Sequence, residues 1–329
     1  MISVVLPTYN RAQLLPRAIR SVLSQTTRDL ELIVVDDCST DGTETVVRAL
    51  KDDRVRYMRS PGNLGPAGAR NLGIRAAAGA YIAFQDSDDA WRPEKLEKQL
   101  SALKSTEADV LFSAVCRHRD GRADEIFPRK EIKPGPVAYE ELLFENLACA
   151  PTLLARAEIL KAHPFDETLR ALEDWALMLE LSRQSRVYYD GACVMDVYEQ
   201  AGSVSGDRSS LLLATHRLYQ RHFQAINRQL PAARQWCLSM LLYAQGTNRL
   251  PFPDDILHLL PDFALREGAL PKRYTLYTRP RTTPLLLARL ISPSPTPILL
   301  TRDMDRFLLP RYGVDPRVFL LPEQFLPKK

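Results

Sequence analysis

The first hundred residues alternate short apolar runs with longer helical patterns, and this order constrains the fold more than any other feature. The runs are rich in Val, Ile and aromatic residues, which predicts strands at Ser3–Thr8, Leu32–Asp36, Val55–Arg59 and Tyr81–Gln85. Helical patterns lie between and after them, at Ala12–Ser24, Gly42–Lys51, Ala67–Ala77 and Glu94–Ser105. Such alternation requires crossover connections, so we predict an α/β fold with a mainly parallel sheet flanked by helices.

Carboxylates follow two of the predicted strands at their carboxyl ends. Asp36 and Asp37 stand at the end of the second strand, and the run Asp86-Ser87-Asp88-Asp89 follows the fourth. Open parallel sheets bind their ligands beyond the carboxyl ends of the strands. We therefore expect this rim to bind a ligand that favours negative charge nearby.

The run after the fourth strand has the spacing of a cation site. Residues two apart in an extended segment point the same way, so Asp86 and Asp88 can face one ion while Ser87 turns aside. Hard oxygen ligands of this kind suit Mg²⁺ or Mn²⁺. A solvated acidic turn is the alternative, but the position between an apolar strand and Trp91 favours the cation.

The composition changes near residue 208. Residues 209–329 hold 17 Lys and Arg against 8 Asp and Glu, a balance of +9, which leaves −5 for residues 1–208 because the whole chain carries +4. The same stretch holds 14 of the 24 prolines. We therefore predict two regions, 1–207 and 208–329.

The C-terminal region shows helical patterns at Leu211–Gln229 and Pro231–Tyr243, so we expect it to be mostly helical. It could pack on the first region or on a second copy of the chain as a homo-oligomer contact. Its basic residues could instead dock on an anionic membrane face that carries a lipid-linked acceptor. No nucleic-acid partner is expected, because no recognised DNA- or RNA-binding motif accompanies the charge.

The five cysteines lie far apart without a CxxC pair, which suggests neither a disulfide framework nor a zinc site and fits a reducing cytoplasm. Residues 1–6 lack the pattern of an export signal. The longest apolar candidate for a membrane span, Pro284–Leu300, is interrupted by Arg289 and three prolines. We expect a cytoplasmic protein, with peripheral binding at the inner face of the membrane as a further option.

Five sequence blocks together resemble family 2 glycosyltransferases of the GT-A fold. They occur in the order and spacing of that family: VVLPTYNR at 4–11, LIVVDDCSTDGT at 32–43, NLGPAGARNLGI at 63–74, DSDDAW at 86–91 and LEDWALMLEL at 172–181. The resemblance covers about residues 1–205. It implies a Rossmann-like nucleotide-binding half and a nucleotide-sugar donor.

The resemblance assigns residues to the nucleotide. Asp37 matches the carboxylate that accepts a hydrogen bond from uracil, which is why a UDP-sugar is preferred, and Pro7 and Tyr9 match the wall against which the base packs. Arg70 lies where its guanidinium could reach a diphosphate oxygen, with a plain surface charge as the alternative. The other positions assigned to the nucleotide are Thr8, Asn71 and Ser87.

The resemblance also assigns the metal and the base. Asp88 matches the metal ligand, with Asp86 helping directly or through water, and Asp89 faces the donor sugar or caps the next segment. Glu173 and Asp174 match an acidic pair in which the aspartate is the general base. The alternative for Asp174 is a helix cap.

The implied activity is an inverting, metal-dependent transfer from a nucleotide sugar to the hydroxyl of a saccharide or lipid-linked acceptor, in bacterial surface polysaccharide, lipopolysaccharide or glycolipid synthesis. A catalytically idle nucleotide-sugar-binding subunit and a sugar nucleotidyltransferase are the alternatives. One block departs from the family. The chain reads Tyr198 to Ser205 where the family commonly has a histidine, which leaves a third protein ligand to the metal in doubt.

Overall fold

The computed structural model describes residues 1–118, 125–128, 132–143 and 146–198, a few positions between 214 and 225, and three short strands closer to the C-terminus. The chain divides into two compact units, Met1–Ala214 and Thr215–Lys329. The predicted boundary at residues 207–208 lies outside the described residues.

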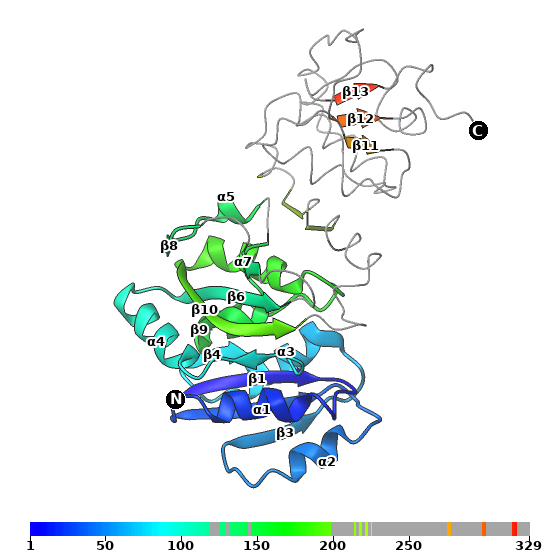
Figure 1. The fold of residues 1–329 in the computed structure, drawn as a ribbon, viewed down its shortest axis with the longest axis vertical. Coiled ribbons are helices and arrows are strands. Elements are labelled where there is room, and N and C mark those ends of the chain that lie inside the picture. Colours follow the sequence, from blue (N-terminus) through cyan, green and yellow to red (C-terminus); the bar gives the residue numbers. More distant parts are fainter. Residues whose placement is uncertain are drawn as a thin grey trace, which may run out of the picture. The chain divides into compact units, whose positions relative to one another are not determined.

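Unit 1 is built on a ten-stranded mixed sheet (Figure 1). The strand order is β3-β2-β1-β4-β9-β6-β10-β5, with β7 paired to β6 and β8 to β10. The strands are β1 Ile2–Thr8, β2 Leu30–Asp36, β3 Val55–Arg59, β4 Tyr81–Phe84, β5 Ala90–Trp91, β6 Val110–His118, β7 Glu125–Phe127, β8 Gly135–Pro136, β9 Leu153–Arg156 and β10 Val187–Tyr198. The helices are α1 Leu15–Leu23, α2 Thr43–Arg48, α3 Gly65–Ala76, α4 Lys95–Ser105, α5 Tyr139–Leu142, the 3-10 turn η1 Ala150–Thr152, α6 Ala157–Ala162 and α7 Glu173–Gln184.

The elements predicted in the first hundred residues are confirmed. Each of the four strands begins and ends within two residues of its predicted bounds, and each of the four helices within three. The short strand β5, which follows the acidic run, was not predicted, since two residues give no usable periodicity.

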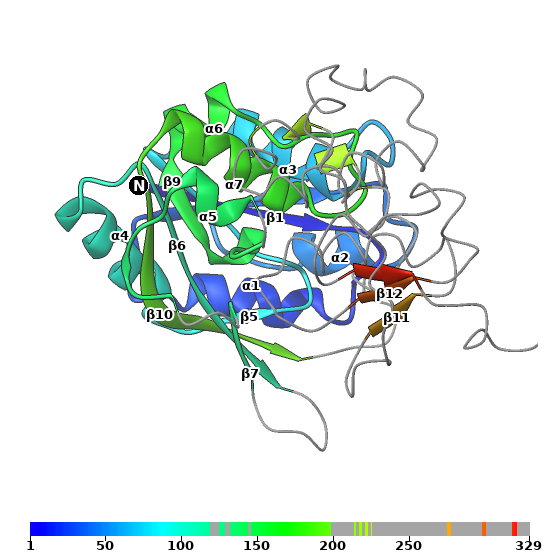
Figure 2. The same cartoon turned by 90° about the horizontal axis from the view of Figure 1, so that it is seen from above.

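Helices cover both faces of the sheet. The helix α1 buries Leu15, Ala18, Ile19 and Val22, the spacing of one helical face, against the apolar side chains of β1 and β2. On the other face α3 approaches β1 so closely that a Cβ on Gly73 would lie 2.2 Å from a methyl carbon of Val5. Figure 2 shows α1 and α3 on opposite sides of β1.

The strand order reverses between β1 and β4. The chain runs from β1 outward through β2 and β3, and β4 then pairs in parallel with the other side of β1. The strand β9 is antiparallel to both β4 and β6, so β6 runs in the same direction as β4. A reversal of this kind leaves a crevice at the carboxyl ends of the two central strands, where such sheets bind ligands.

In unit 2 the described residues form a parallel three-stranded sheet of β11 Thr275–Tyr277, β12 Ile298–Leu300 and β13 Val318–Leu320. These strands were not predicted. The expected helices at 211–229 and 231–243 lie outside the described residues, apart from a few helical positions between 214 and 225. Within the described part of the chain, no helix is long and apolar enough to cross a membrane.

Candidate active site

The residues predicted at the strand ends come together at the carboxyl ends of β1, β2 and β4. The N–H of Gln85, just after β4, donates to the carbonyl of Val5 at 3.0 Å, and the N–H of Asp37 donates to the carbonyl of Thr8 at 2.8 Å. These bonds hold the ends of β2, β1 and β4 side by side. The carboxylates after β2 and after β4 therefore share one rim, as the sequence predicts.

Asp37 is buried and already holds part of the rim in place. Its carboxylate accepts hydrogen bonds from the Ser60 hydroxyl at 2.9 Å and from the N–H groups of Leu64 and Gly65, both at 2.8 Å. Gly65 has φ +77°, a left-handed backbone conformation that favours glycine, at the position where its N–H meets Asp37. A carboxylate offers about four acceptor positions. One acceptor position of the Asp37 carboxylate is left for a nucleotide base. The predicted contact with uracil is therefore possible in this geometry and stays a prediction.

The segment after β1 presents an aromatic ring. Tyr9 is 47% exposed, so a face of its ring is available for stacking. Thr8 is buried, and its hydroxyl has no hydrogen-bond partner among the described residues. Buried polar groups are normally hydrogen-bonded, so this hydroxyl is available to a ligand at the rim.

Arg70 joins two acidic segments that are far apart in sequence. From α3, its guanidinium donates to Asp86 and to Glu173, each at 2.8 Å, and the side chain is only 6% exposed. Burial alone would lower the pKa of Arg70, but the two carboxylates outweigh it and raise the pKa. The surface-charge alternative is therefore wrong. Both terminal nitrogens of Arg70 donate to carboxylates here. A diphosphate oxygen, as predicted, would have to share these N–H donors with Asp86 and Glu173.

The acidic run after β4 concentrates negative charge. Ser87 is buried while Asp86 and Asp88 are half-buried, but residues 87 and 88 form a turn rather than an extended segment, so the shared direction of Asp86 and Asp88 stays a prediction. Burial raises the pKa of Asp86, an effect that Arg70 opposes and Asp88 reinforces. Burial and the carboxylates of Asp86 and Asp88 raise the pKa of Asp89 to about 8. Crowding of this kind is relieved by a cation.

These residues fit a hard divalent cation. Within the described part of the chain the Asp88 carboxylate makes no hydrogen bond or ion pair, so both of its oxygens are available, and Asp86 keeps one oxygen beyond Arg70. Carboxylate oxygens are the ligands that Mg²⁺ and Mn²⁺ prefer.

Asp174 lies in the first turn of α7, next to Glu173. It is not the helix cap, because the cap position is Leu172, in the left-handed conformation with φ 58°. Its carboxylate accepts the N–H of Trp175 at 2.7 Å and the side-chain amide of Asn146 at 3.2 Å. Burial, and next the Glu173 charge, raise the pKa of Asp174 to about 7. A carboxylate with this pKa suits a general base near neutral pH.

Two residues of the site were missed by sequence reasoning. Asn146 contacts the predicted base, and Arg17 of α1 donates a hydrogen bond to the backbone carbonyl of Asp88. Neither stands in a block that carries the family resemblance. Arg17 lies within the predicted helix 12–24, where a basic residue is expected to face the solvent. Only the tertiary structure brings it to the acidic run.

Asn71 lies on α3 but its side chain makes structural contacts. The amide nitrogen donates to the Phe165 carbonyl at 2.9 Å and to Glu167 at 2.8 Å, and the amide oxygen accepts the Phe165 N–H at 2.9 Å. These bonds tie α3 to the segment that precedes α7. The predicted nucleotide contact of Asn71 stays a prediction.

Comparison with known proteins identifies the family. The family model described as Glycosyl transferase family 2 matches residues 3–161. An uncharacterized glycosyltransferase from Haemophilus influenzae is 31% identical over 225 residues, covering 67% of this chain and 87% of that protein. The chain belongs to glycosyltransferase family 2. The E. coli enzyme WfaP, named as a UDP-Glc:alpha-D-GlcNAc-diphosphoundecaprenol beta-1,3-glucosyltransferase, is 28% identical over 69% of the chain and 93% of its own length.

The family includes much longer proteins. The chain matches an uncharacterized glycosyltransferase from Rickettsia conorii at 33% identity over 189 residues and spans only 31% of its length. Among solved structures, residues 1–349 of S. aureus TarS superpose with a TM-score of 0.58 at 20% identity, covering 78% of this chain and 82% of that one. A likeness at this identity concerns the fold, which is of the GT-A type.

For this family 2 glycosyltransferase, one site feature stays open. The strand β10 ends at Tyr198, and residues 199–205, which lack the family's histidine, lie outside the described residues. Of the predicted metal ligands, Asp86 and Asp88 lie within the described residues, and their role as ligands stays a prediction.

Proposed function

We propose that this chain moves a sugar from a nucleotide-sugar donor, preferably a UDP-sugar, to an acceptor hydroxyl with inversion, using Mn²⁺ or Mg²⁺. The observation that carries the proposal is the Arg70 bridge. By binding Asp86 and Glu173 together, it holds the acidic run and the neighbouring Asp174 at one site. Transfer chemistry needs this pairing of a leaving-group site and a base.

The chain's own residues account for donor binding. The exposed ring of Tyr9 is available to stack on the base, and the remaining acceptor position of Asp37 is available to a ring N–H. The preference for UDP is supported by the name of WfaP, which specifies UDP-Glc, and by a TarS structure in complex with UDP-GlcNAc. A mannosyltransferase from Pyrobaculum calidifontis with a similar structure was solved with GDP-Man and Mn²⁺. The experiment that tests the donor therefore includes other nucleotide sugars as well.

Asp88 and Asp86 would hold the divalent cation, which when bound offsets the charge that develops on the leaving diphosphate. Arg70 keeps Asp86 in place from the opposite side. Asp174 takes the proton from the acceptor hydroxyl, the acceptor oxygen forms the new bond to the anomeric carbon, and the bond from that carbon to the diphosphate oxygen breaks. Asn146 and the Trp175 N–H orient the Asp174 carboxylate.

The acceptor class is proposed from the relatives. WfaP is named for a diphosphoundecaprenol acceptor, and other relatives are named for succinoglycan and teichuronic acid biosynthesis. We therefore place this chain in bacterial surface polysaccharide or glycolipid synthesis, with a saccharide or lipid-linked acceptor.

Thermal melting with a donor panel tests the proposal. In Mn²⁺, a UDP-sugar should raise the melting temperature more than GDP-, dTDP- or CMP-sugars, because a ligand at 100 times its Kd stabilises the folded state by about 2.7 kcal/mol. In EDTA the shift should shrink. No shift with any nucleotide sugar would contradict the donor class. Binding without release of free UDP in the presence of lipid-linked acceptors would favour the idle binding subunit.

Membrane docking is a separate part of the proposal. The +9 balance of residues 209–329 should draw the full chain to anionic liposomes at low salt, since each basic residue near such a surface contributes about 1 kcal/mol. Co-sedimentation at low and high salt measures this. Equal binding to neutral and anionic liposomes, or none to either, would favour the alternative in which the C-terminal region packs on the first region or on a second copy of the chain.

A further inference from the structure

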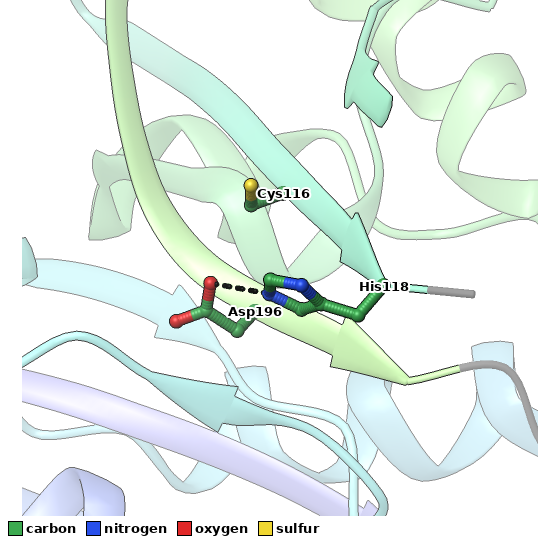
Figure 3. Close-up of side chains that lie close together, drawn as sticks. All are labelled: Cys116, His118 and Asp196. Atoms are coloured by element: carbon green, nitrogen blue, oxygen red, sulfur yellow. Dashed lines mark hydrogen bonds and ion pairs between the residues drawn. The ribbon is translucent and has the colours of Figure 1, made fainter. Parts of the chain in front are cut away.

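Three metal-ligating side chains meet at the ends of β6 and β10, apart from the acidic run (Figure 3). Cys116 and His118 are two apart on β6, so they point to the same side of the sheet. Asp196 is the register partner of Cys116 on the parallel strand β10. The ligand atoms all lie within 4.8 Å of one another. No other set of three such ligands gathers this closely within the described residues.

We propose that Cys116, His118 and Asp196 form a site for a zinc ion or a similar borderline metal ion. A thiolate, an imidazole and a carboxylate are all established zinc ligands, with bond lengths of roughly 2.0–2.3 Å. The His118 Nε2 already lies 2.9 Å from an Asp196 oxygen, a separation that two ligands of one ion can have. The Cys116 thiol lies within 4.8 Å of both of these ligand atoms.

The donor set separates this site from the cation site of the proposed function. A thiolate is a soft ligand that Mg²⁺ and Mn²⁺ avoid, whereas the acidic run offers oxygen ligands alone. The two sites should therefore bind different metals, and each can be saturated while the other is measured.

The surroundings of Asp196 support a ligand role. Arg92 donates to both carboxylate oxygens, at 2.9 Å from Nη2 and 3.2 Å from Nε. Because a carboxylate has about four acceptor positions, Arg92 can orient Asp196 and leave a lone pair for the metal.

A metal here would connect β6 and β10 near the acidic run. Asp196 of β10 pairs with Ala90 of β5, the residue that follows Asp89. An ion held by β6 and β10 would therefore fix the sheet edge from which the acidic run extends. This is a structural role, and it does not depend on the proposed transfer reaction.

The test titrates the reduced, EDTA-treated full chain with Co²⁺ in excess Mg²⁺, followed by competition with Zn²⁺. We expect a thiolate-to-cobalt absorption band that saturates near one ion per chain and is displaced by Zn²⁺. Cys116→Ser should abolish the band. His118→Ala should weaken binding by at least the roughly 10–100-fold that even outer-shell changes cause. The matched variants Cys38→Ser and His163→Ala, together with Asp88→Ala, should keep both the band and the affinity.

Thermal melting supplies the second readout. Zn²⁺ should raise the melting temperature of the wild type and of Asp88→Ala, but not that of Cys116→Ser or Asp196→Asn. Circular dichroism checks that each variant is folded. If Cys116→Ser does not fold, Asp196→Asn serves as the test variant in its place. Absence of a thiolate band, or a band that Cys38→Ser removes and Cys116→Ser does not, would overturn the site. Nucleotide binding that depends on Asp88 would be unaffected by that failure.

Discussion

Asp174→Asn is expected to bind UDP normally and fold normally while its turnover collapses. Asn preserves the size of the side chain and can still accept the Trp175 N–H, but it cannot take a proton. General-base catalysis contributes about 10²–10⁴-fold, so kcat should fall by that order. Initial rates at saturating donor measure the effect. Near-normal turnover would remove Asp174 from the mechanism.

The pH profile gives an independent check on the same residue. Because the base must be deprotonated and the pKa of Asp174 is raised to about 7, kcat/KM should fall as the pH decreases through about 7. The residual activity of Asp174→Asn should not show this decrease at low pH. Glu173→Gln keeps a group that can accept from Arg70 and should be milder than Asp174→Asn. If it is the more severe of the two, Glu173 is the better candidate for the base.

Arg70→Met is expected to lower the free energy of unfolding of unit 1 substantially. The substitution keeps an apolar stem but leaves Asp86 and Glu173 without the cation that bridges them. Removing one partner from a buried ion pair typically costs about 3–5 kcal/mol. Urea denaturation at neutral pH measures the loss. The deficit should shrink at acidic pH, because protonated carboxyl groups no longer repel each other.

Two substitutions control this prediction. Arg75→Met removes an exposed arginine from the last turn of the same helix and should change stability by no more than about 0.5 kcal/mol. Arg70→Lys keeps the charge but not the planar fork that reaches both carboxylates, so its loss should be intermediate. Equal stability of Arg70→Met and Arg75→Met would mean that the bridge contributes nothing.

The local order of the first unit could be predicted because each element carries its own signal. Apolar β-branched runs and helical periodicity identify β1 to β4 and α1 to α4, and the strand ends then give the rim. Pairing across the rest of the sheet could not be predicted in this way. The strand β9 enters between β4 and β6 in antiparallel orientation, and nothing in Leu153–Arg156 indicates which strands it will join.

The site was predicted as a set of residues rather than as a geometry. Asp86, Asp88, Glu173 and Asp174 could be identified, but the Arg70 bridge between them depends on how α3 and α7 pack. Asn146 could not be predicted for the same reason, because its amide reaches Asp174 only after the chain folds. The Cys116, His118 and Asp196 cluster also escaped, because its ligands do not form a short sequence motif.

Titration of UDP in Mn²⁺ and in EDTA tests the central claim most directly. The wild type should bind UDP at least tenfold more tightly in Mn²⁺, a difference of about 1.4 kcal/mol or more. Asp88→Ala should abolish the difference, and Asp53→Ala, which removes an exposed carboxylate elsewhere, should preserve it. Equal affinity of the wild type in Mn²⁺ and EDTA, matched by Asp88→Ala, would contradict a metal-dependent nucleotide site at the acidic run.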